Sequence, residues 1–246
     1  MMYLSEIRML EMPAEDTYLR EIPAVRQLFA EGGIRFEKPV TFLVGENGSG
    51  KSTLLEAFAA AYGMNPEGGS RDYAFATDAT HSALYRSMQI IRRNYPQDSY
   101  FLRAESFYNV ATYLEESGSL MTRYGGRSLH VQSHGEAFFT LMTERFTGKG
   151  LYLLDEPEAA LSPMRQMSML TVLHDLVQRD AQFVIATHSP ILTAYPDAEI
   201  LLCSEEGITK TAYQDTALYQ LTKRFLMHPE QMLRHLLDDV QDGKTE

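Results

Sequence analysis

Nine residues near the start of the chain, GENGSGKST, have the types and spacing that polyphosphate binding requires. They contain the pattern G-x-x-x-x-G-K-[ST], whose glycines let the backbone curl so that successive N–H groups point at phosphate oxygens. The lysine reaches the terminal phosphates, and the hydroxyl after it ligates Mg²⁺. The structural alternative is an ordinary Gly/Ser turn before a helix. The predicted nucleotide-binding residues are Gly45, Glu46, Asn47, Gly48, Ser49, Gly50, Lys51, Ser52 and Thr53.

Two adjacent carboxylates end the apolar run LYLLDE. Asp155 and Glu156 are costly to bury, so we expect them to emerge at the strand end, at the sheet edge where open α/β folds bind ligands. There Asp155 would ligate Mg²⁺ directly or through water, together with Ser52, and Glu156 would act as general base on an attacking water. The alternative is a strand end followed by an acidic cap for the next helix.

A histidine follows a third apolar run, QFVIAT. His188 is expected beside the terminal phosphate, where an imidazole can contact the phosphate and orient the water. A lone histidine after a strand can also have a purely structural role. The predicted catalytic residues are therefore Lys51, Glu156 and His188.

The segments that must position these residues are apolar runs alternating with helix formers, which predicts a parallel sheet covered on both faces. The loop at Gly45 is expected to join a buried strand to a helix. Predicted strands are Tyr3–Leu10, Ile34–Phe36, Val40–Val44, Ser99–Ala104, 151–155, 182–187 and 199–203. Predicted helices are Ser52–Tyr62, Ser106–Leu114, Glu136–Phe146, Pro163–Gln178 and a C-terminal tail, Asp215–Val240.

Composition narrows the classes of partner. A formal net charge of -11 over 246 residues argues against binding nucleic acid through bulk charge, although a local basic patch remains open. Its members would be Arg86, Arg92, Arg93 and Arg103, with a solvated helix face as the alternative interpretation. The single cysteine, Cys203, excludes an internal disulfide and is interpreted as a buried small hydrophobe. No apolar run has the length of a bilayer span, so a cytoplasmic protein without membrane insertion is expected.

Taken together, the motifs resemble those of the ATP-binding cassette (ABC) ATPases, in the soluble branch that includes the SMC, RecF and OLD-type proteins. GENGSGKS is similar to Walker A, LYLLDEPE to Walker B with its catalytic glutamate, EAALS to the D-loop and ATHSP to the switch-histidine motif. The likeness extends to compact, stand-alone bacterial AAA-family ATPases and covers nearly the whole chain. It implies one α/β P-loop domain over residues 1–246, with a mostly parallel central sheet, an antiparallel N-terminal β portion and a helical subdomain inserted at about 83–146.

The resemblance also implies a signature motif ahead of Walker B, and HVQSHGEAFF stands in that place. Ser133, Gly135 and Glu136 correspond to family positions that contact nucleotide, whereas His134 replaces a glycine. The serine hydroxyl and the Gly135 N–H at a helix start could still meet an anion, although an N-cap serine followed by glycine would look the same. In the family this motif completes the site of a second subunit, so a head-to-tail homodimer on ATP binding is implied.

A glutamine that touches Mg²⁺ is expected after the strand YFLRA, and Glu105 occupies that place. A carboxylate there would need neutralisation by the metal or a proton, and the alternative is a carboxylate at a helix start. No adenine-stacking aromatic stands out; Tyr18 and Phe36 are upstream candidates.

Three functions compete on this basis. The first is an ATP-hydrolysing, Mg²⁺-dependent switch that acts with a protein effector or nuclease partner, in DNA repair or antiviral defence, with DNA contact left open. The second is the nucleotide-binding subunit of a membrane transporter, which the altered signature and the missing glutamine disfavour. The third is a P-loop small-molecule kinase, disfavoured because the Asp-Glu pair indicates water as the acceptor.

Overall fold

The computed structural model describes residues 1–14, 17–66, 68–70, 83–103 and 134–242. The predicted helix Ser106–Leu114 and two predicted site residues, Glu105 and Ser133, lie outside these ranges. The helical insertion predicted at about 83–146 stays a prediction, because most of it lies outside them too. Its described flanks are a 3₁₀ turn at Ala83–Ser87, two strands and one helix.

The described residues form a seven-stranded central sheet in the order β10-β9-β3-β8-β7-β6-β4. The strands from β9 to β6 are parallel to one another, and the two outer strands are antiparallel to their neighbours. This confirms the predicted mostly parallel sheet. The bounds are β3 Val40–Val44, β4 Gly69–Ser70, β6 Asp98–Arg103, β7 Gly150–Asp155, β8 Gln182–Ala186, β9 Glu199–Ser204 and β10 Gly207–Thr211.

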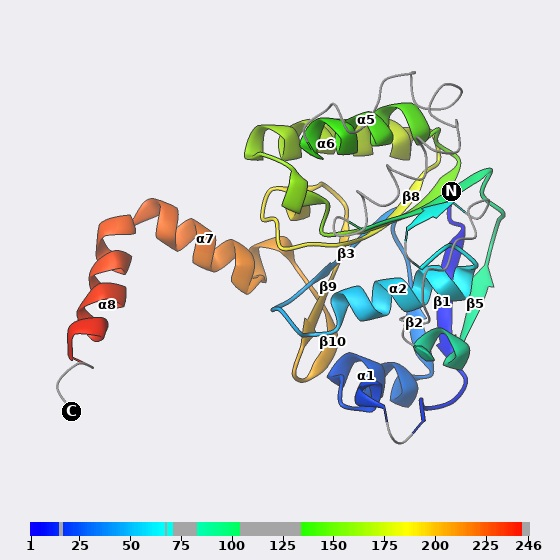
Figure 1. Cartoon of the computed structure of the whole chain (residues 1–246), viewed down its shortest axis with the longest axis horizontal. Helices are drawn as coiled ribbons and strands as arrows, with labels where there is room; N and C mark the ends of the chain where they lie inside the picture. Colours follow the sequence, from blue (N-terminus) through cyan, green and yellow to red (C-terminus); the bar gives the residue numbers. More distant parts are fainter. Residues whose placement is uncertain (15–16, 67, 71–82, 104–133, 243–246) are drawn as a thin grey trace.

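The inner strands are apolar on both sides because both faces of the sheet are covered (Figure 1). Helix α2 (Lys51–Tyr62) packs on one face, where Leu55 and Phe58 meet alternate residues of the strands. Helices α5 (His134–Arg145) and α6 (Pro163–Gln178) pack on the other, where Phe138 and Leu173 belong to a second buried core. Four further 3₁₀ turns span Tyr18–Arg20, Pro157–Ala160, Leu192–Ala194 and Tyr213–Asp215.

A separate antiparallel sheet has the order β2-β1-β5 and lies beyond α2, as the resemblance implied. Its strands are β1 Leu4–Met9, β2 Gly33–Arg35 and β5 Met88–Arg92. The interpretation of the basic residues as a solvated helix face is wrong, since Arg92 ends strand β5. Its guanidinium donates to the Tyr62 carbonyl at 3.0 Å and covers the Tyr62 ring, so this charge caps α2.

One helix, α1, and three strands, β4, β5 and β10, were not predicted. Helix α1 (Pro23–Glu31) and strand β10 pack against each other at the sheet margin, joined by Gln27, whose amide accepts from the Ile208 N–H and donates to its carbonyl.

The predicted C-terminal tail is confirmed as helical, but it divides at Pro229 into α7 (Ala217–Met227) and α8 (Pro229–Asp242). Figure 1 shows this pair projecting from the body of the molecule. Within the described ranges, no helix is both long and apolar enough to cross a membrane.

One buried side chain, Gln182 at the start of β8, ties the N-terminal sheet to the central sheet. Its carbonyl oxygen accepts from the N–H groups of Tyr3 (2.7 Å) and Leu4 (2.9 Å), and its amide donates to the Leu4 carbonyl at 2.8 Å. The side chain is fully buried, so no water replaces these bonds when it is lost. Strand β1 is therefore held at its first residues by one glutamine.

We predict that Gln182→Leu, which keeps the volume, lowers the free energy of unfolding by about 3 kcal/mol or more, because three buried backbone groups lose their partner. Urea unfolding followed by circular dichroism measures this. Gln89→Leu, at an exposed position on β5, is the matched control and should change the value by less than about 0.5 kcal/mol. Equal stabilities for the two variants would show that Gln182 does not hold the sheets together.

Candidate functional site

The loop between β3 and α2 has a backbone that only glycine allows at two positions. Gly45 has φ 149°, and a Cβ atom there would lie 2.1 Å from the Cys203 carbonyl oxygen. Gly50 has φ 91° and precedes the first residue of α2, where a Cβ would meet Ile22 at 2.6 Å. The loop is thus pressed against β9 and the start of α1, and it leads directly into the N-terminus of α2, the end of a helix that suits an anion.

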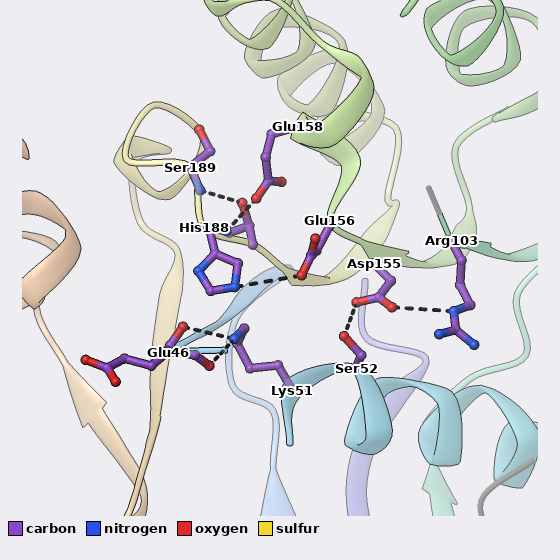
Figure 2. A network of polar contacts seen from close by, with 11 residues as sticks. Glu46, Lys51, Ser52, Arg103, Asp155, Glu156, Glu158, His188 and Ser189 are labelled. Atoms are coloured by element: carbon purple, nitrogen blue, oxygen red, sulfur yellow. Dashed lines mark hydrogen bonds and ion pairs between the residues drawn. The ribbon is translucent and has the colours of Figure 1, made fainter. Parts of the chain in front are cut away.

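Lys51 is buried at the centre of this loop (Figure 2). Its ammonium donates to the carbonyls of Gly45 (2.9 Å) and Glu46 (2.7 Å). Burial lowers the pKa of Lys51, and the nearby carboxylates oppose this effect. A buried cation whose partners are neutral carbonyls is available to a stronger, anionic acceptor.

Ser52 and Asp155 meet across the loop and the end of β7. The Ser52 hydroxyl donates to Asp155 Oδ1 at 2.9 Å, and the Asp155 side chain is 7% exposed. The other oxygen, Oδ2, lies 3.6 Å from Nε of Arg103. Arg103 also donates from Nη1 to Glu56 Oε2 at 3.0 Å, so it joins β6, β7 and α2.

Arg103 is a site residue that sequence reasoning missed, because it was assigned to a basic patch. The parallel register of β6 on β7 places Arg103 directly opposite Asp155. The available signal was its position next to the last residue of the predicted strand Ser99–Ala104, since parallel strands bring such residues to one edge.

Glu156 and His188 face each other beside Lys51 (Figure 2). Glu156 is in the left-handed region (φ 49°), and its N–H donates to the Ala186 carbonyl at the end of β8. Its Oε1 lies 3.7 Å from His188 Nε2, and both side chains are partly exposed, 43% and 34%. The Nε2 atom of His188 is itself buried and has no hydrogen-bond partner in the described part of the chain, whereas the rest of both side chains reaches the surface of this edge.

The turn that carries His188 is held by two further residues that the sequence did not single out. Glu158 Oε1 accepts from the His188 N–H. The Ser189 hydroxyl donates to Gln166 of α6 at 2.6 Å and accepts from the N–H groups of Ile191 and Leu192. The histidine is therefore presented by a turn that is fixed on both sides.

The other predicted site residues are not gathered here in the described part of the chain. Gly135 is in the first turn of α5, and Glu136, in the same turn, is exposed and pairs with Arg165 of α6 at 3.3 Å. Phe36 is buried and packs edge-on against Phe58, which removes it as an adenine-stacking candidate. Tyr18 remains exposed.

The chemistry of this cluster fits a polyphosphate with a divalent cation. The loop brings together three groups that suit an anion: the helix start at α2, the buried ammonium of Lys51, and the hydroxyl of Ser49, which is buried and has no hydrogen-bond partner in the described part of the chain. No group of three metal-ligating side chains is found among the described residues. Mg²⁺ commonly binds through one or two protein oxygens plus phosphates and water, which is what Ser52 and Asp155 offer.

Two protein-family models match the sequence. A model described as an AAA domain matches residues 23–117, and one described as an AAA domain, candidate AbiEii toxin of a type IV toxin–antitoxin system, matches residues 128–194. Together they span about two thirds of the chain. No protein with a curated description matches the sequence.

Solved structures with a similar fold belong to ABC and SMC ATPases. A chain of an inward-facing ABC transporter described as of metal-chelate type matches with a TM-score of 0.51 at 18% identity, over 90% of this chain and 88% of the other. CbiO1 of the Clostridium perfringens ABC transporter complex cbiONQ matches with a TM-score of 0.48 at 17% identity, over 97% of this chain and 100% of the other. The SMC head domain of Thermotoga maritima matches with a TM-score of 0.45 at 15% identity, over 86% of this chain and 100% of the other.

Cys203 lies directly beneath the loop, so the reactivity of its thiol tests whether the loop covers it. The side chain is buried, and burial raises the pKa of the thiol to about 11 against a smaller opposite effect of Lys51. Since only the thiolate reacts, we predict that a disulfide reagent at about pH 8 labels the folded protein slowly, with a rate that rises about tenfold per pH unit up to pH 10. Labelling as fast as in urea would mean that the loop does not cover Cys203.

Proposed function

We propose that this chain is a P-loop ATPase of the ABC type, an ATP-hydrolysing switch whose nucleotide sites are completed when two copies pair head to tail. The two AAA-domain matches and the fold that it shares with a chain of an ABC transporter support this proposal. The observation that carries this proposal is the gathering of Lys51, Ser52, Asp155, Glu156 and His188 at one edge of the sheet. Lys51 and Ser52 begin α2 after the β3 loop, whereas the other three residues lie at or just after the ends of strands β7 and β8.

In this proposal, the loop N–H groups and Lys51 bind the triphosphate. Lys51 exchanges the Gly45 and Glu46 carbonyls for phosphate oxygens, which are stronger acceptors for an ammonium. Ser52 and Asp155 would hold Mg²⁺, which, when bound, neutralises charge on the phosphates. Base selectivity has no assigned residue.

Glu156 is the proposed general base. Its partly exposed carboxylate can accept a proton from a water, and the left-handed backbone at this residue directs it away from the β7 core. His188, 3.7 Å away, would orient the same water and contact the terminal phosphate. Glu158 positions His188 through its backbone N–H.

A second copy would supply Ser133, Gly135 and Glu136 to the terminal phosphate. The place of Gly135 and the exposed Glu136 in the first turn of α5 supports this, because the N–H groups and the positive dipole end of a helix start suit an anion. The terminal phosphate would then be the group that both copies contact. Binding ATP would close the pair and hydrolysis would open it.

The switch is proposed to control a protein effector or nuclease, in DNA repair or antiviral defence, with DNA contact as an open question. The family description that names a candidate toxin supports an effector role. Phosphate release without any added acceptor separates this proposal from a small-molecule kinase.

For Glu156→Gln we predict retained ATP binding, hydrolysis slower by about 10²-fold or more, and an ATP-dependent dimer that persists on a sizing column. The amide keeps the shape of the side chain but accepts no proton. Phosphate release and light-scattering mass, each with and without ATP, provide the measurements.

Glu205→Gln, at an exposed position on the β9–β10 turn, is the matched control and should behave like the wild type. Full turnover by Glu156→Gln would remove Glu156 from the role of base, whatever the oligomeric state.

Arg103 is predicted to oppose the binding of Mg²⁺ at Asp155, since its guanidinium is a cation 3.6 Å from the carboxylate that the metal needs. Arg103→Gln should therefore lower the Mg²⁺ concentration at half-maximal nucleotide binding severalfold, measured with a fluorescent ATP analogue. Arg103→Lys, which keeps the charge, should stay close to the wild type. An unchanged or higher Mg²⁺ requirement in Arg103→Gln would contradict this role.

A further inference from the structure

One side chain of α6, Gln166, joins the two segments that carry Glu156 and His188. Its Nε2 donates to the Leu161 carbonyl at 3.0 Å, just beyond the 3₁₀ turn that follows Glu156. Its Oε1 accepts from the Ser189 hydroxyl at 2.6 Å, one residue after His188. The proposed general base and the histidine are therefore linked through a single amide group as well as through the sheet.

The direction of both bonds is fixed by the surroundings of the Ser189 hydroxyl. Its oxygen accepts from the N–H groups of Ile191 (3.1 Å) and Leu192 (3.0 Å), in the turn that follows it. Ser189 is 3% exposed, so its one hydroxyl proton is directed to Gln166 and not to water. With Oε1 of Gln166 turned toward Ser189, Nε2 faces the Leu161 carbonyl. A carboxylate or an apolar side chain of this length could not make both bonds.

The segment between Glu156 and Leu161 is tight, so the bond at its end restrains the residues before it. The Ala159 N–H donates to the Glu156 carbonyl at 3.0 Å, and the Leu161 N–H donates to the Glu158 carbonyl at 2.8 Å. Helix α6, from which Gln166 projects, is packed into the second buried core. Gln166 thus ties this segment to an element that is anchored in the core.

A second link between the same two segments is the bond from the His188 N–H to Glu158 (Figure 2). A single hydrogen bond leaves a turn free to rotate about that bond. The bond between Gln166 and Ser189 lies one residue further along and comes from another element. The two bonds together therefore restrain the orientation of the turn as well as its position.

Orientation matters because the His188 imidazole lies close to Glu156 without bonding to it. His188 Nε2 is 3.7 Å from Glu156 Oε1, and it has no hydrogen-bond partner in the described part of the chain. A water or phosphate oxygen beside this pair can reach both atoms at about 2.8 Å. A displacement of the imidazole by roughly 1 Å would take one of those bonds out of range.

We infer that Gln166 is a positioning residue for hydrolysis, which sets the His188 imidazole relative to Glu156 without being part of the nucleotide site. This inference rests on the proposed function and deepens it, because it assigns a role to a residue of α6 that lies outside the phosphate loop. Its signature is a slower chemical step with unchanged nucleotide affinity.

Gln166→Leu removes both bonds at similar volume, so it should lower kcat at least about tenfold and change the Kd of a fluorescent ATP analogue less than about twofold. Gln166→Glu still accepts from Ser189 but cannot donate to the Leu161 carbonyl, so it should also lower kcat. Gln178→Leu, exposed at the other end of α6, is the matched control and should keep the wild-type rate. Urea unfolding followed by circular dichroism shows whether each variant is folded under the assay conditions.

A His188→Ala background separates positioning from a general structural effect. Without an imidazole to position, adding Gln166→Leu should change the rate by less than about twofold, because two residues that act through one another are not additive. The rate is measured as phosphate formed in a single turnover with protein in excess, which resolves slow hydrolysis. If Gln166→Leu does not fold, Gln166→Glu takes its place in both comparisons.

A wild-type kcat in the folded Gln166 variants would overturn the inference, and so would an equal loss of rate with and without His188. Failure of the proposed function would look different. In that case the wild type would release no phosphate from ATP, or His188→Ala would release it at the wild-type rate.

Discussion

The site depends on one constraint: parallel strands of a single sheet end at a common edge. The β7 register places Asp155 opposite Ala186 on one side and Arg103 on the other, and β3, on the far side of β8, ends at Val44, just before the loop. Residues more than a hundred positions apart thereby come within hydrogen-bonding distance, as Ser52 and Asp155 do. The apolar runs of these strands fix the edge because both faces of the sheet are buried.

The two buried charges at this edge, Lys51 and Asp155, both have hydrogen-bond partners, but the partners are of different kinds. Lys51 is held by neutral carbonyls, whereas Asp155 is shared between a hydroxyl and a guanidinium that Glu56 in turn holds. Removing a cation from water and giving it only carbonyls is costly, and phosphate binding would relieve that cost. The arrangement thus favours an anionic ligand at Lys51 and a cation at Asp155.

Much of the fold followed from periodicity, because β3, α2, β7, α6 and β8 are long or wholly apolar elements. Helix α1 was missed although the sequence carries helix signals there, with Pro23 at its start and Gly32 just after its end. Strand β10 was missed because only its first two residues are buried, so it shows no apolar alternation. In the site, the loop and the Asp-Glu pair were visible as motifs. Arg103 and Glu158 were not visible as motifs. The contact of Arg103 with Asp155 depends on the sheet register, and the bond from the His188 N–H to Glu158 depends on the turn geometry, neither of which a single sequence displays.

The central claim is that one terminal phosphate is contacted by two copies of the chain. A structure of the Glu156→Gln variant bound to ATP and Mg²⁺ tests it most directly. The account predicts that Ser133 and Gly135 of one protomer lie within hydrogen-bonding distance of the terminal phosphate held by the Gly45–Ser52 loop of the other. A nucleotide-bound structure in which each triphosphate is contacted by a single chain would contradict it.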